Sequence, residues 1–197
     1  MSARDEVLAR VRKALGPDQD PPPVPRDYRP SGTMTQAELV ELLEDRLVDY
    51  KARVRHCEEA SLDATITAAL GDRGAKNLVV PTDLAQWGTV DAGLSTAELD
   101  TFDGVLTGST LAVAETGTIV LDGSPDQGRR AITLVPDYHL CIVRAPQVVQ
   151  TVPEAIALLD PARALTWISG PSATSDIELN RVEGVHGPRT LEVILVS

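Results

Sequence analysis

Residues 61–81, SLDATITAALGDRGAKNLVVP, decide the fold that we expect for this chain. Residues 61–70 carry a helical pattern, and either Gly71 or Gly74 can end that helix. Residues 77–81 form a short apolar run that is too brief for a helix and is typical of a buried strand. A helix followed by such a strand predicts an α/β fold with a mostly parallel sheet.

N-terminal to this unit, the sequence predicts two more helices and a linker. Residues 4–15 fit a short amphipathic helix, and residues 16–30 hold six of the fourteen prolines, which predicts a stiff, extended linker. Residues 35–57 begin with a capping box, TQAE, and then repeat apolar side chains at spacings of three and four, so we expect one long helix there. We divide the chain into residues 1–30, a helix and Pro-rich linker, and residues 31–197, one α/β domain.

C-terminal to the same unit, β-branched residues are frequent and glycines interrupt them, as is typical of short strands and tight turns. We expect residues 115–117, Glu-Thr-Gly, to form the turn between two of these strands. Residues 131–135 fit a strand or a short helix equally well, and residues 175–182 fit one or two helical turns. The predicted strands are residues 104–106, 111–114, 118–121, 139–144, 165–169 and 190–196, with a helix at residues 151–160.

The charge balance of the chain limits its partners. Eighteen Lys and Arg against twenty-nine Asp and Glu give a formal net charge of −11, which argues against a general nucleic-acid binder and against adhesion to anionic membranes. No stretch approaches the roughly 18 to 20 apolar residues that span a bilayer, and the charged N-terminal segment does not fit a secretory signal. We therefore expect a cytoplasmic protein that binds neither nucleic acid nor membrane.

The two cysteines, Cys57 and Cys141, lie far apart in the sequence and outside any CxxC pattern. An iron–sulfur cluster usually takes four thiolates, which this chain does not supply. The three histidines do not fall into ligand spacing with the cysteines, and no standard nucleotide fingerprint is present. We therefore expect no metal site, no redox centre and no cofactor in this chain.

One candidate site follows the predicted strand at residues 104–106, where small and polar residues gather. Glycine lets backbone amides approach a ligand closely and hydroxyls add donors, so this composition suits a carboxylate, phosphate or acyl group. The alternative is a pair of hairpin turns whose glycines only allow a positive φ. The candidate anion-binding residues are Thr107, Gly108, Ser109, Thr110, Thr116 and Gly117.

Glu115 and His186 are the two titratable candidates for catalysis. A Glu115 carboxylate that is partly desolvated in its turn would have a raised pKa suited to acid–base or nucleophilic work; a solvated turn residue is the alternative. His186, in the sequence EGVHGP, titrates near neutral pH and can position a substrate or shuttle protons, or it can simply bond a loop backbone. His139, inside a predicted strand, is a weaker candidate.

A second candidate site begins where the predicted strand at residues 165–169 ends. A Gly-Pro turn and several hydroxyls precede a predicted helix start, whose free amides can form a nest for an anion; plain helix capping is the alternative. Ligands of open α/β sheets usually bind beyond the carboxyl ends of strands, and we expect this site and the Glu-Thr-Gly turn to share one cleft. The second candidate anion-binding set is Gly170, Ser172, Thr174, Ser175 and Asp176.

Three motifs in order resemble the lactate utilization protein C (LUD-domain) family: AETGTIVLDG at residues 114–123, ISGPSATSDIE at residues 168–178 and VEGVHGPRTLEVILV at residues 182–196. The resemblance covers residues 104–196 and, more loosely, the helical N-terminal region. It implies a three-layer α/β/α fold similar to the sugar-phosphate isomerase and CoA-transferase superfamily. It also implies a bacterial, cytosolic role in the oxidation of L-lactate to pyruvate, beside companion proteins that carry iron–sulfur centres.

This resemblance leads to our first hypothesis, a subunit or accessory protein of an L-lactate-oxidising system that binds a small anionic metabolite and has no redox centre of its own. Its expected partners are iron–sulfur companion proteins and a small carboxylate or phosphate ligand. The alternative is a free-standing isomerase or acyl/CoA-transferase-like enzyme that uses Glu115, because Glu-Thr-Gly loosely parallels the Glu-Asn-Gly turn of some CoA transferases. Thr116 stands where those enzymes have the Asn. A third hypothesis is an anion-sensing module.

Overall fold

The structure is a computed structural model that describes residues 2–16, 23–25, 31–174, 182–183 and 187–197. Three candidate site residues, Ser175, Asp176 and His186, lie outside these ranges. The same holds for residues 175–181, where the sequence predicts helical turns.

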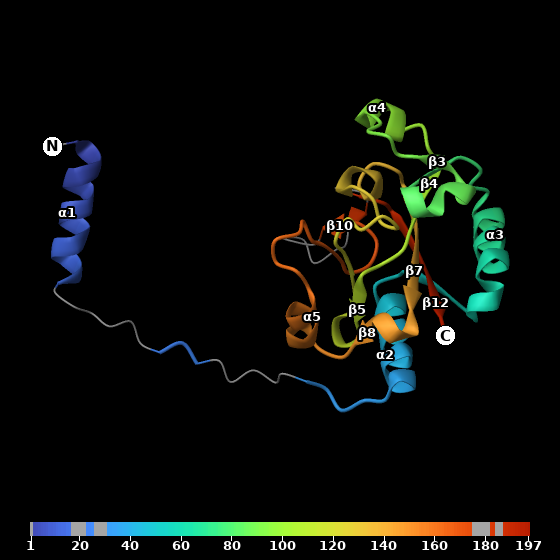
Figure 1. Ribbon diagram of the computed structural model, residues 1–197, viewed down its shortest axis with the longest axis horizontal. Helices are drawn as coiled ribbons and strands as arrows, with labels where there is room; N and C mark the ends of the chain where they lie inside the picture. The colour runs from blue at the N-terminus through green and yellow to red at the C-terminus, as the bar shows by residue number, and fades with distance from the viewer. Residues whose placement is uncertain (1, 17–22, 26–30, 175–181, 184–186) are drawn as a thin grey trace.

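A six-stranded sheet in which every strand pair is parallel forms the centre of the molecule (Figure 1). Its strand order is β1-β12-β7-β4-β2-β3, so β7 and β12 lie in the interior, and almost all of their side chains are buried. This arrangement confirms the predicted α/β fold with a mostly parallel sheet, whose inner strands are largely apolar because both faces are covered. The strands are β1 (Arg53–Cys57), β2 (Leu78–Val80), β3 (Thr89–Val90), β4 (Gly104–Thr107), β7 (Tyr138–Arg144) and β12 (Thr190–Val196).

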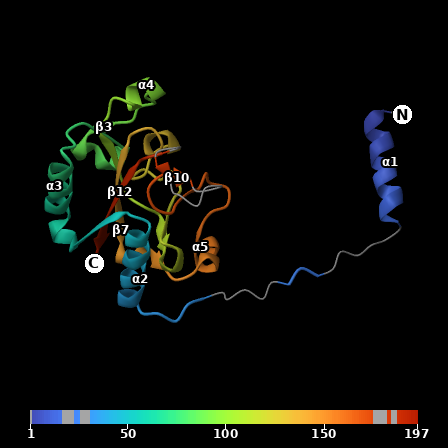
Figure 2. The ribbon, with the colours of Figure 1, turned by 180° about the vertical axis from the view of Figure 1, so that it is seen from behind.

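Helices cover both faces of this main sheet. α3 (Leu62–Arg73) buries its apolar side chains against one face. α2 (Gln36–Asp49) buries three leucines against the opposite face, which it shares with a second, four-stranded sheet. α5 (Val152–Leu158) packs against the far side of that second sheet, and Figure 2 shows β7 and β12 between α3 on one side and α5 on the other. The layers are therefore a helix, the main sheet, and then a helix together with the second sheet.

The second sheet contains the strands predicted on either side of the Glu-Thr-Gly turn. β5 (Leu111–Val113) and β6 (Thr118–Leu121) pair antiparallel. Gly117 ends the turn between them with a φ of +59°, a left-handed conformation that favours glycine because it has no Cβ. β8 (Val148–Val149) pairs with β5, and β9 (Thr166–Ile168) pairs with β6. These strands and this turn confirm the predictions for this part of the chain.

The long helix predicted for residues 35–57 is wrong. α2 ends at Asp49, and residues 53–57 form β1, which pairs in parallel with β12 at the edge of the main sheet. The C-cap of the helix is Tyr50, and Lys51 takes a left-handed φ of +71° where the chain turns. The apolar spacing that continued the helical pattern is a local signal, whereas β1 is stabilised by hydrogen bonds to the last strand of the chain. No local pattern reports that pairing.

The short elements settle one open alternative. The segment for which the sequence fits a strand or a helix falls largely in a 3₁₀ helix, η4 (Arg130–Thr133). α1 (Ala3–Leu15) has the expected amphipathic sequence, and each of its residues is exposed. The remaining elements are η1 (Glu59–Ser61), η2 (Thr82–Trp87), α4 (Thr96–Leu99), η3 (Ala114–Thr116), η5 (Ala145–Gln147), β10 (Ala173–Thr174) and β11 (Val182–Glu183).

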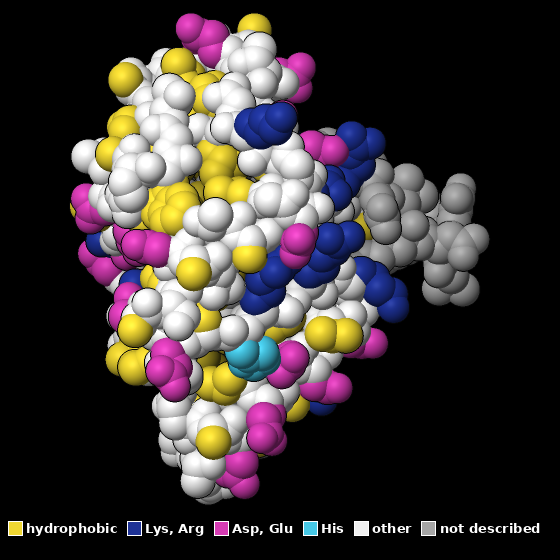
Figure 3. All heavy atoms as spheres, turned by 90° about the vertical axis from the view of Figure 1, so that its right-hand side faces the viewer, with side chains coloured by type: hydrophobic (Ala, Val, Ile, Leu, Met, Phe, Trp, Pro, Cys, Tyr) yellow, Lys and Arg dark blue, Asp and Glu magenta, His cyan; other side chains and the backbone are white. Residues whose placement is uncertain are grey.

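The surface has a mixed charge pattern despite the net charge of −11. On the face drawn in Figure 3, Lys and Arg side chains gather near the middle, and Asp and Glu side chains surround them. Among the described residues, no helix combines the length and the apolar character needed to cross a bilayer.

Candidate functional site

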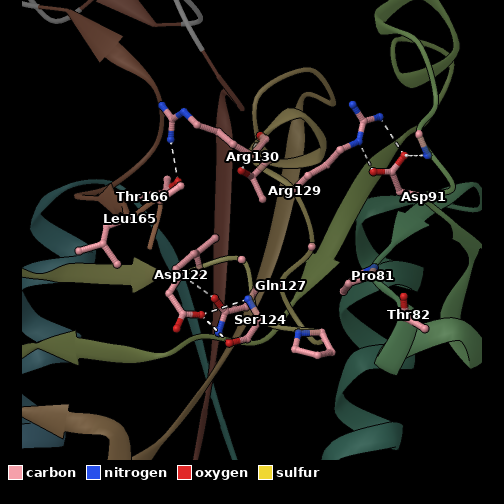
Figure 4. Close-up of a pocket in the computed structure, with 17 residues that line it drawn as sticks. Pro81, Thr82, Asp91, Asp122, Ser124, Gln127, Arg129, Arg130, Leu165 and Thr166 are labelled. Carbon is pink, nitrogen blue, oxygen red and sulfur yellow. Dashed lines mark hydrogen bonds and ion pairs between the residues drawn. The ribbon is translucent and has the colours of Figure 1, made fainter. Parts of the chain in front are cut away.

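A cleft with two adjacent lobes opens between the main sheet and the second sheet. The large lobe has a volume of about 640 Å³ and is lined mainly by the loop of residues 121–130 and by residues that follow β2 and β3 (Figure 4). The small lobe has a volume of about 240 Å³ and is lined by residues of η4, β9 and the Gly-Pro corner at residues 169–173. Arg130, Thr133 and Thr166 line both lobes, so the two lobes are adjacent and share a wall.

The loop of residues 122–130 is fixed by hydrogen bonds among its own side chains. The buried Gln127 accepts a hydrogen bond from Asp122 N at 2.6 Å, and Ser124 Oγ donates to the Asp122 carboxylate at 2.6 Å. Burial works to raise the pKa of Asp122, but the hydrogen bonds that it accepts and the charge of Arg163 hold this pKa below its ordinary value. Asp122 is therefore an ionised carboxylate that pairs with Arg163 and forms part of the wall of the large lobe.

Arg129 and Arg130 leave this loop in opposite directions (Figure 4). Arg129 donates to Asp91, with Nη2 at 2.9 Å from Oδ1, and this contact holds the pKa of Asp91 below its ordinary value. Arg130 donates from Nη1 to Thr166 Oγ1 at 2.9 Å, and it forms no ion pair with any residue that the structure describes. A guanidinium with donors to spare suits a carboxylate or a phosphate. Among the described residues that line the cleft, Arg130 is therefore the arginine whose charge no carboxylate takes up.

His139 reaches the small lobe from β7. Its side chain is 1% exposed, and its Nε2 lies 2.8 Å from Thr107 Oγ1. Burial lowers the pKa of His139 to about 4, so the ring is neutral at pH 7. Among the described residues that line the small lobe, Arg130 is the one with a formal charge. The described part of the small lobe's lining thus carries a positive charge, although the chain as a whole is acidic.

Residues 107–110, the first set of predicted anion ligands, use their polar groups inside the protein. The hydroxyl of Thr107 contacts His139, and the backbone N of Gly108 donates to a loop carbonyl at 2.8 Å. Ser109 Oγ donates to a carbonyl of β7 at 3.0 Å, and Thr110 Oγ1 accepts from the Gln127 amide at 3.0 Å. None of the four lines either lobe. They fasten β4 and β5 to β7 and to the loop.

The Glu-Thr-Gly turn also lies outside the lining of both lobes. Glu115 is half-buried and accepts a hydrogen bond from Gln150 Nε2 at 3.1 Å. Thr116 is exposed and donates to Thr118 Oγ1 at 2.8 Å, and Gly117 packs against α2. The catalytic role suggested for Glu115 stays a prediction, and the cleft described above does not include this carboxylate.

The Gly-Pro corner supplies Gly170 and Ser172 to the small lobe. Gly170 has a φ of +81° and lies against the Tyr50 side chain, where a Cβ would come within 2.6 Å of that residue. The corner touches the Glu-Thr-Gly region through one hydrogen bond of 2.8 Å between Ser169 Oγ and Thr118 Oγ1. The two predicted segments are therefore neighbours, but the corner alone lines the cleft among their described residues. Thr174 continues the chain into β10.

Comparison with known proteins places this chain in a family. Residues 94–196 match the model of the LUD domain, which is slightly more than half of the chain. Lactate utilization protein C from Deinococcus radiodurans is 47% identical over 99% of this chain and 96% of its own length. The chain belongs to the LUD-domain family.

Two further similarities extend along most of this LUD-domain protein. Lactate utilization protein C from Shouchella clausii is 27% identical over 98% of this chain and 97% of its own length. A crystal structure of a DUF162 family protein from Deinococcus radiodurans is 43% identical, matches with a TM-score of 0.69, and covers 84% of this chain and 100% of that one. The LUD-domain match contains Arg130, His139 and Thr166, so the small lobe is built largely by the LUD domain.

Sequence reasoning missed the two residues that give the small lobe its polar character. No site residue is predicted in the loop of residues 122–130, and His139 is ranked below His186. A signal for Arg130 does exist, because two adjacent arginines end a glycine-containing loop in a chain of net charge −11. Which of the two is available to a ligand depends on Asp91, a partner distant in sequence that pairs with the first of them.

Potential metal ligands are scattered in the part of the chain that the structure describes. No group of three or more His, Cys, Asp or Glu side chains there is placed to hold a metal ion. Cys57 and Cys141 lie on β1 and β7, and β12 separates these strands, so the strands run about 10 Å apart. The expectation that this chain holds no metal and no cofactor stays a prediction.

Proposed function

We propose that this LUD-domain protein serves L-lactate utilization, as a subunit or accessory protein of a cytoplasmic system that oxidises L-lactate to pyruvate. The relatives named Lactate utilization protein C support the pathway, the Deinococcus radiodurans protein over nearly the whole chain. In this proposal electrons pass through iron–sulfur companion proteins, and this chain binds the anionic metabolite.

The cysteines of the chain support that division of roles. Two thiols are fewer than the four that an iron–sulfur cluster usually takes. Cys141 is fully buried, and burial raises its pKa to about 12, so it stays a protonated core thiol at neutral pH. Any cluster in the pathway would therefore belong to a companion protein.

The observation that carries the binding role is the charge arrangement of the cleft. Arg129 pairs with Asp91 and Arg163 pairs with Asp122, which leaves Arg130 without a carboxylate partner among the described residues. A monoanionic carboxylate would pair with the positive charge of Arg130. The same carboxylate could also accept hydrogen bonds from hydroxyl groups in the walls of the cleft. A charge-assisted hydrogen bond of this kind contributes about 1.5 to 3 kcal/mol.

Titration calorimetry of the full chain with pyruvate and with L-lactate tests this role. We expect at least one of the acids to bind, and Arg130→Gln to weaken its binding roughly tenfold or more. Arg163→Gln is the matched control, because Arg163 is likewise an exposed arginine near the cleft, but it pairs with Asp122 and lines neither lobe. Equal weakening by both variants, or no binding of either acid to the wild type, contradicts the proposed site.

Growth and co-purification test the pathway. Deletion of the gene is expected to abolish growth on L-lactate and to leave growth on pyruvate intact. Affinity purification of the tagged full chain from lactate-grown cells is expected to recover proteins that carry iron–sulfur centres. Normal growth of the deletion strain on L-lactate would overturn the pathway assignment, and repeated recovery of the chain alone would overturn the proposed partnership.

A further inference from the structure

His139 is the buried polar group of the small lobe that the proposed anion site does not use. It is the second residue of β7, and its strand neighbours Tyr138 and Leu140 belong to the core beneath α3. Because side chains alternate along a strand, His139 points to the opposite face, where the second sheet and the Gly-Pro corner close the small lobe. The ring is therefore built into the floor of that lobe.

The hydrogen bonding of His139 leaves one ring nitrogen for a ligand. A neutral imidazole has one N–H donor and one acceptor nitrogen, and Thr107 Oγ1, 2.8 Å from Nε2, uses one of the two. Among the described residues, no side-chain N or O atom that is sealed from solvent lacks a partner. The second ring nitrogen has no partner there, so it opens onto the lobe that the ring lines.

The Thr107 hydroxyl allows the ring to be used in either tautomer. A threonine hydroxyl can donate to an unprotonated Nε2 or accept from a protonated one. It also lies 3.7 Å from Cys141 Sγ, a second group toward which it can donate. The nitrogen that faces the lobe can therefore accept a hydrogen bond from a ligand hydroxyl or donate one to a ligand carbonyl.

The small lobe has room for a small ligand beside both Arg130 and His139. Its 240 Å³ corresponds to about eight water molecules at about 30 Å³ each, and it lies below the range of about 300 to 1,000 Å³ that is usual for drug-sized ligands. Apolar side chains, among them Leu134 and Leu191, make up much of the remaining wall. A ligand of a few heavy atoms whose carboxylate pairs with Arg130 would place its adjacent atoms in this lobe, which His139 also lines.

We infer that His139 is the specificity-determining residue of this site, and that it hydrogen-bonds the oxygen on C2 of a 2-hydroxy or 2-oxo acid whose carboxylate pairs with Arg130. The inference rests on the proposed function, because it takes the anion site as given. An acid without that oxygen leaves the buried ring nitrogen unpaired, and sites built around such a group reject ligands that lack the partner. Plain carboxylic acids are therefore the class that this residue excludes.

A three-ligand titration tests the inference on the full chain, with pyruvate, L-lactate and propionate as probes. Propionate has the same carbon skeleton and no oxygen on C2. We expect the wild type to bind pyruvate and L-lactate roughly tenfold or more tightly than propionate. His139→Phe, which keeps a planar ring and removes the hydrogen bond, is expected to bind all three acids within about twofold of one another, with the affinity for propionate retained.

Two further variants separate recognition from folding. Thr107→Val removes the hydroxyl that positions the ring and is expected to lower the preference about threefold, which keeps the test valid if circular dichroism shows His139→Phe to be unfolded. His139→Gln, whose amide can both donate and accept, is expected to restore part of the preference. A merely structural role for His139 predicts instead that its variants lower the affinity for all three acids alike.

The outcomes distinguish this inference from the proposed function. If the wild type binds the three acids equally, or if folded His139→Phe keeps the full preference, the role of His139 is overturned while the Arg130 site stands. If the wild type binds none of the three, the anion site itself fails and the inference fails with it. If the wild type prefers pyruvate and L-lactate to propionate and His139→Phe loses this preference, both the Arg130 anion site and the role of His139 are supported.

Discussion

Two polar regions of this protein, residues 107–117 and the small lobe of the cleft, differ in how their polar groups are used. In the first region hydroxyls bond to backbone carbonyls and to neighbouring side chains, and glycines allow close packing. In the small lobe Arg130 and His139 keep hydrogen-bonding capacity that no described residue takes up.

This difference teaches that a cluster of hydroxyls and glycines in a sequence indicates tight packing as readily as it indicates a binding site. The two regions should therefore respond differently to substitution. Changes in residues 108–117 should lower stability and leave ligand affinity intact, and a change at Arg130 should do the reverse. Thr107 is set apart because its hydroxyl contacts the His139 ring. Each prediction below tests one side of that contrast.

The largest expected effect is on the packing side, at Gly117. In Gly117→Ala the new Cβ would lie 2.7 Å from Arg46 Cβ and 3.1 Å from the Arg46 carbonyl carbon, at a φ of +59° that disfavours alanine. We expect the free energy of unfolding to fall by about 3 to 4 kcal/mol, from backbone strain together with overpacking. Urea denaturation measures this change.

Gly71→Ala is the matched control for that variant. Gly71 lies inside α3, and a Cβ there meets no atom within 4 Å. We expect this substitution to raise the free energy of unfolding by up to about 1 kcal/mol, because alanine is the better helix former. Similar small changes in both variants would show that the Gly117 turn tolerates a side chain and is not tightly packed.

The pH dependence of stability tests the burial of His139. The pKa of this ring is about 4 in the folded protein and has an ordinary value of 6.5, so the unfolded chain binds more protons between these values. Stability contributed by the neutral ring is therefore present above pH 6.5 and is lost as the pH falls toward 4. The loss is on the order of 2 to 3 kcal/mol at about 1.4 kcal/mol for each pKa unit.

Urea denaturation at pH 7, 6, 5 and 4.5 measures this loss, with His139→Phe as the reference. The variant lacks the titrating ring, so its free energy of unfolding should fall less over the same interval. Carboxylates such as Asp91, whose pKa lies below its ordinary value, lose their contribution at lower pH and affect both proteins equally. Parallel curves for the two proteins would mean that His139 is not held neutral by burial.

A smaller effect is expected at Ser109, again on the packing side. Its buried hydroxyl donates to Ile142 O at 3.0 Å and lies 3.3 Å from Gln147 Oε1. Ser109→Ala removes the side-chain donor to Ile142 O, whereas Gln147 Oε1 still accepts from Arg144 N at 2.8 Å. We expect a loss of about 1 to 2 kcal/mol in unfolding free energy with pyruvate affinity unchanged. Thr116→Ala, at an exposed hydroxyl, should change stability by less than about 0.5 kcal/mol. A tenfold loss of pyruvate affinity in Ser109→Ala would restore this segment as a ligand site.

The smallest expected effect on stability is at Arg130. Because its side chain is exposed and makes one hydrogen bond to Thr166 among the described residues, Arg130→Gln should change the unfolding free energy by less than about 0.5 kcal/mol. Arg129→Gln breaks the pair with the nearly buried carboxylate of Asp91 and should cost about 1 to 2 kcal/mol without affecting affinity. Urea denaturation and titration with pyruvate, applied to both variants, check that Arg129→Gln loses stability and Arg130→Gln loses affinity. The opposite result, with affinity lost in Arg129→Gln and stability lost in Arg130→Gln, would contradict the prediction.

The sequence predicts well those parts of the fold whose stability is local or whose residues are apolar throughout. The buried strand at residues 78–80 and the turn at Gly117 follow from runs of a few residues. β1 could not be predicted in the same way, since its partner is the last strand of the chain and its apolar spacing continues that of α2.

The candidate site was predictable only in part, and for a related reason. The Gly-Pro corner is recognisable from its composition, and it supplies Gly170 and Ser172 to the small lobe. The availability of Arg130 depends on which distant carboxylate takes Arg129, and the polarity of the lobe depends on the face of β7 that carries His139. Both are properties of tertiary contacts, which a single sequence does not display. The roles predicted for Glu115 and His186 stay predictions.

The strand order of the main sheet, in which N-terminal strands flank the C-terminal strands on both sides, has a consequence for any attempt to isolate residues 94–196 of this chain. A fragment that starts at residue 94, where the family match begins, would lack β1, β2 and β3 and both helices that cover the sheet. In this fragment β4 and β12 would be exposed edge strands. The apolar faces of the sheet that α2 and α3 cover in the full chain would contact water. Such a fragment should aggregate rather than fold. The unit that folds is therefore larger than residues 94–196, the region that matches the family model.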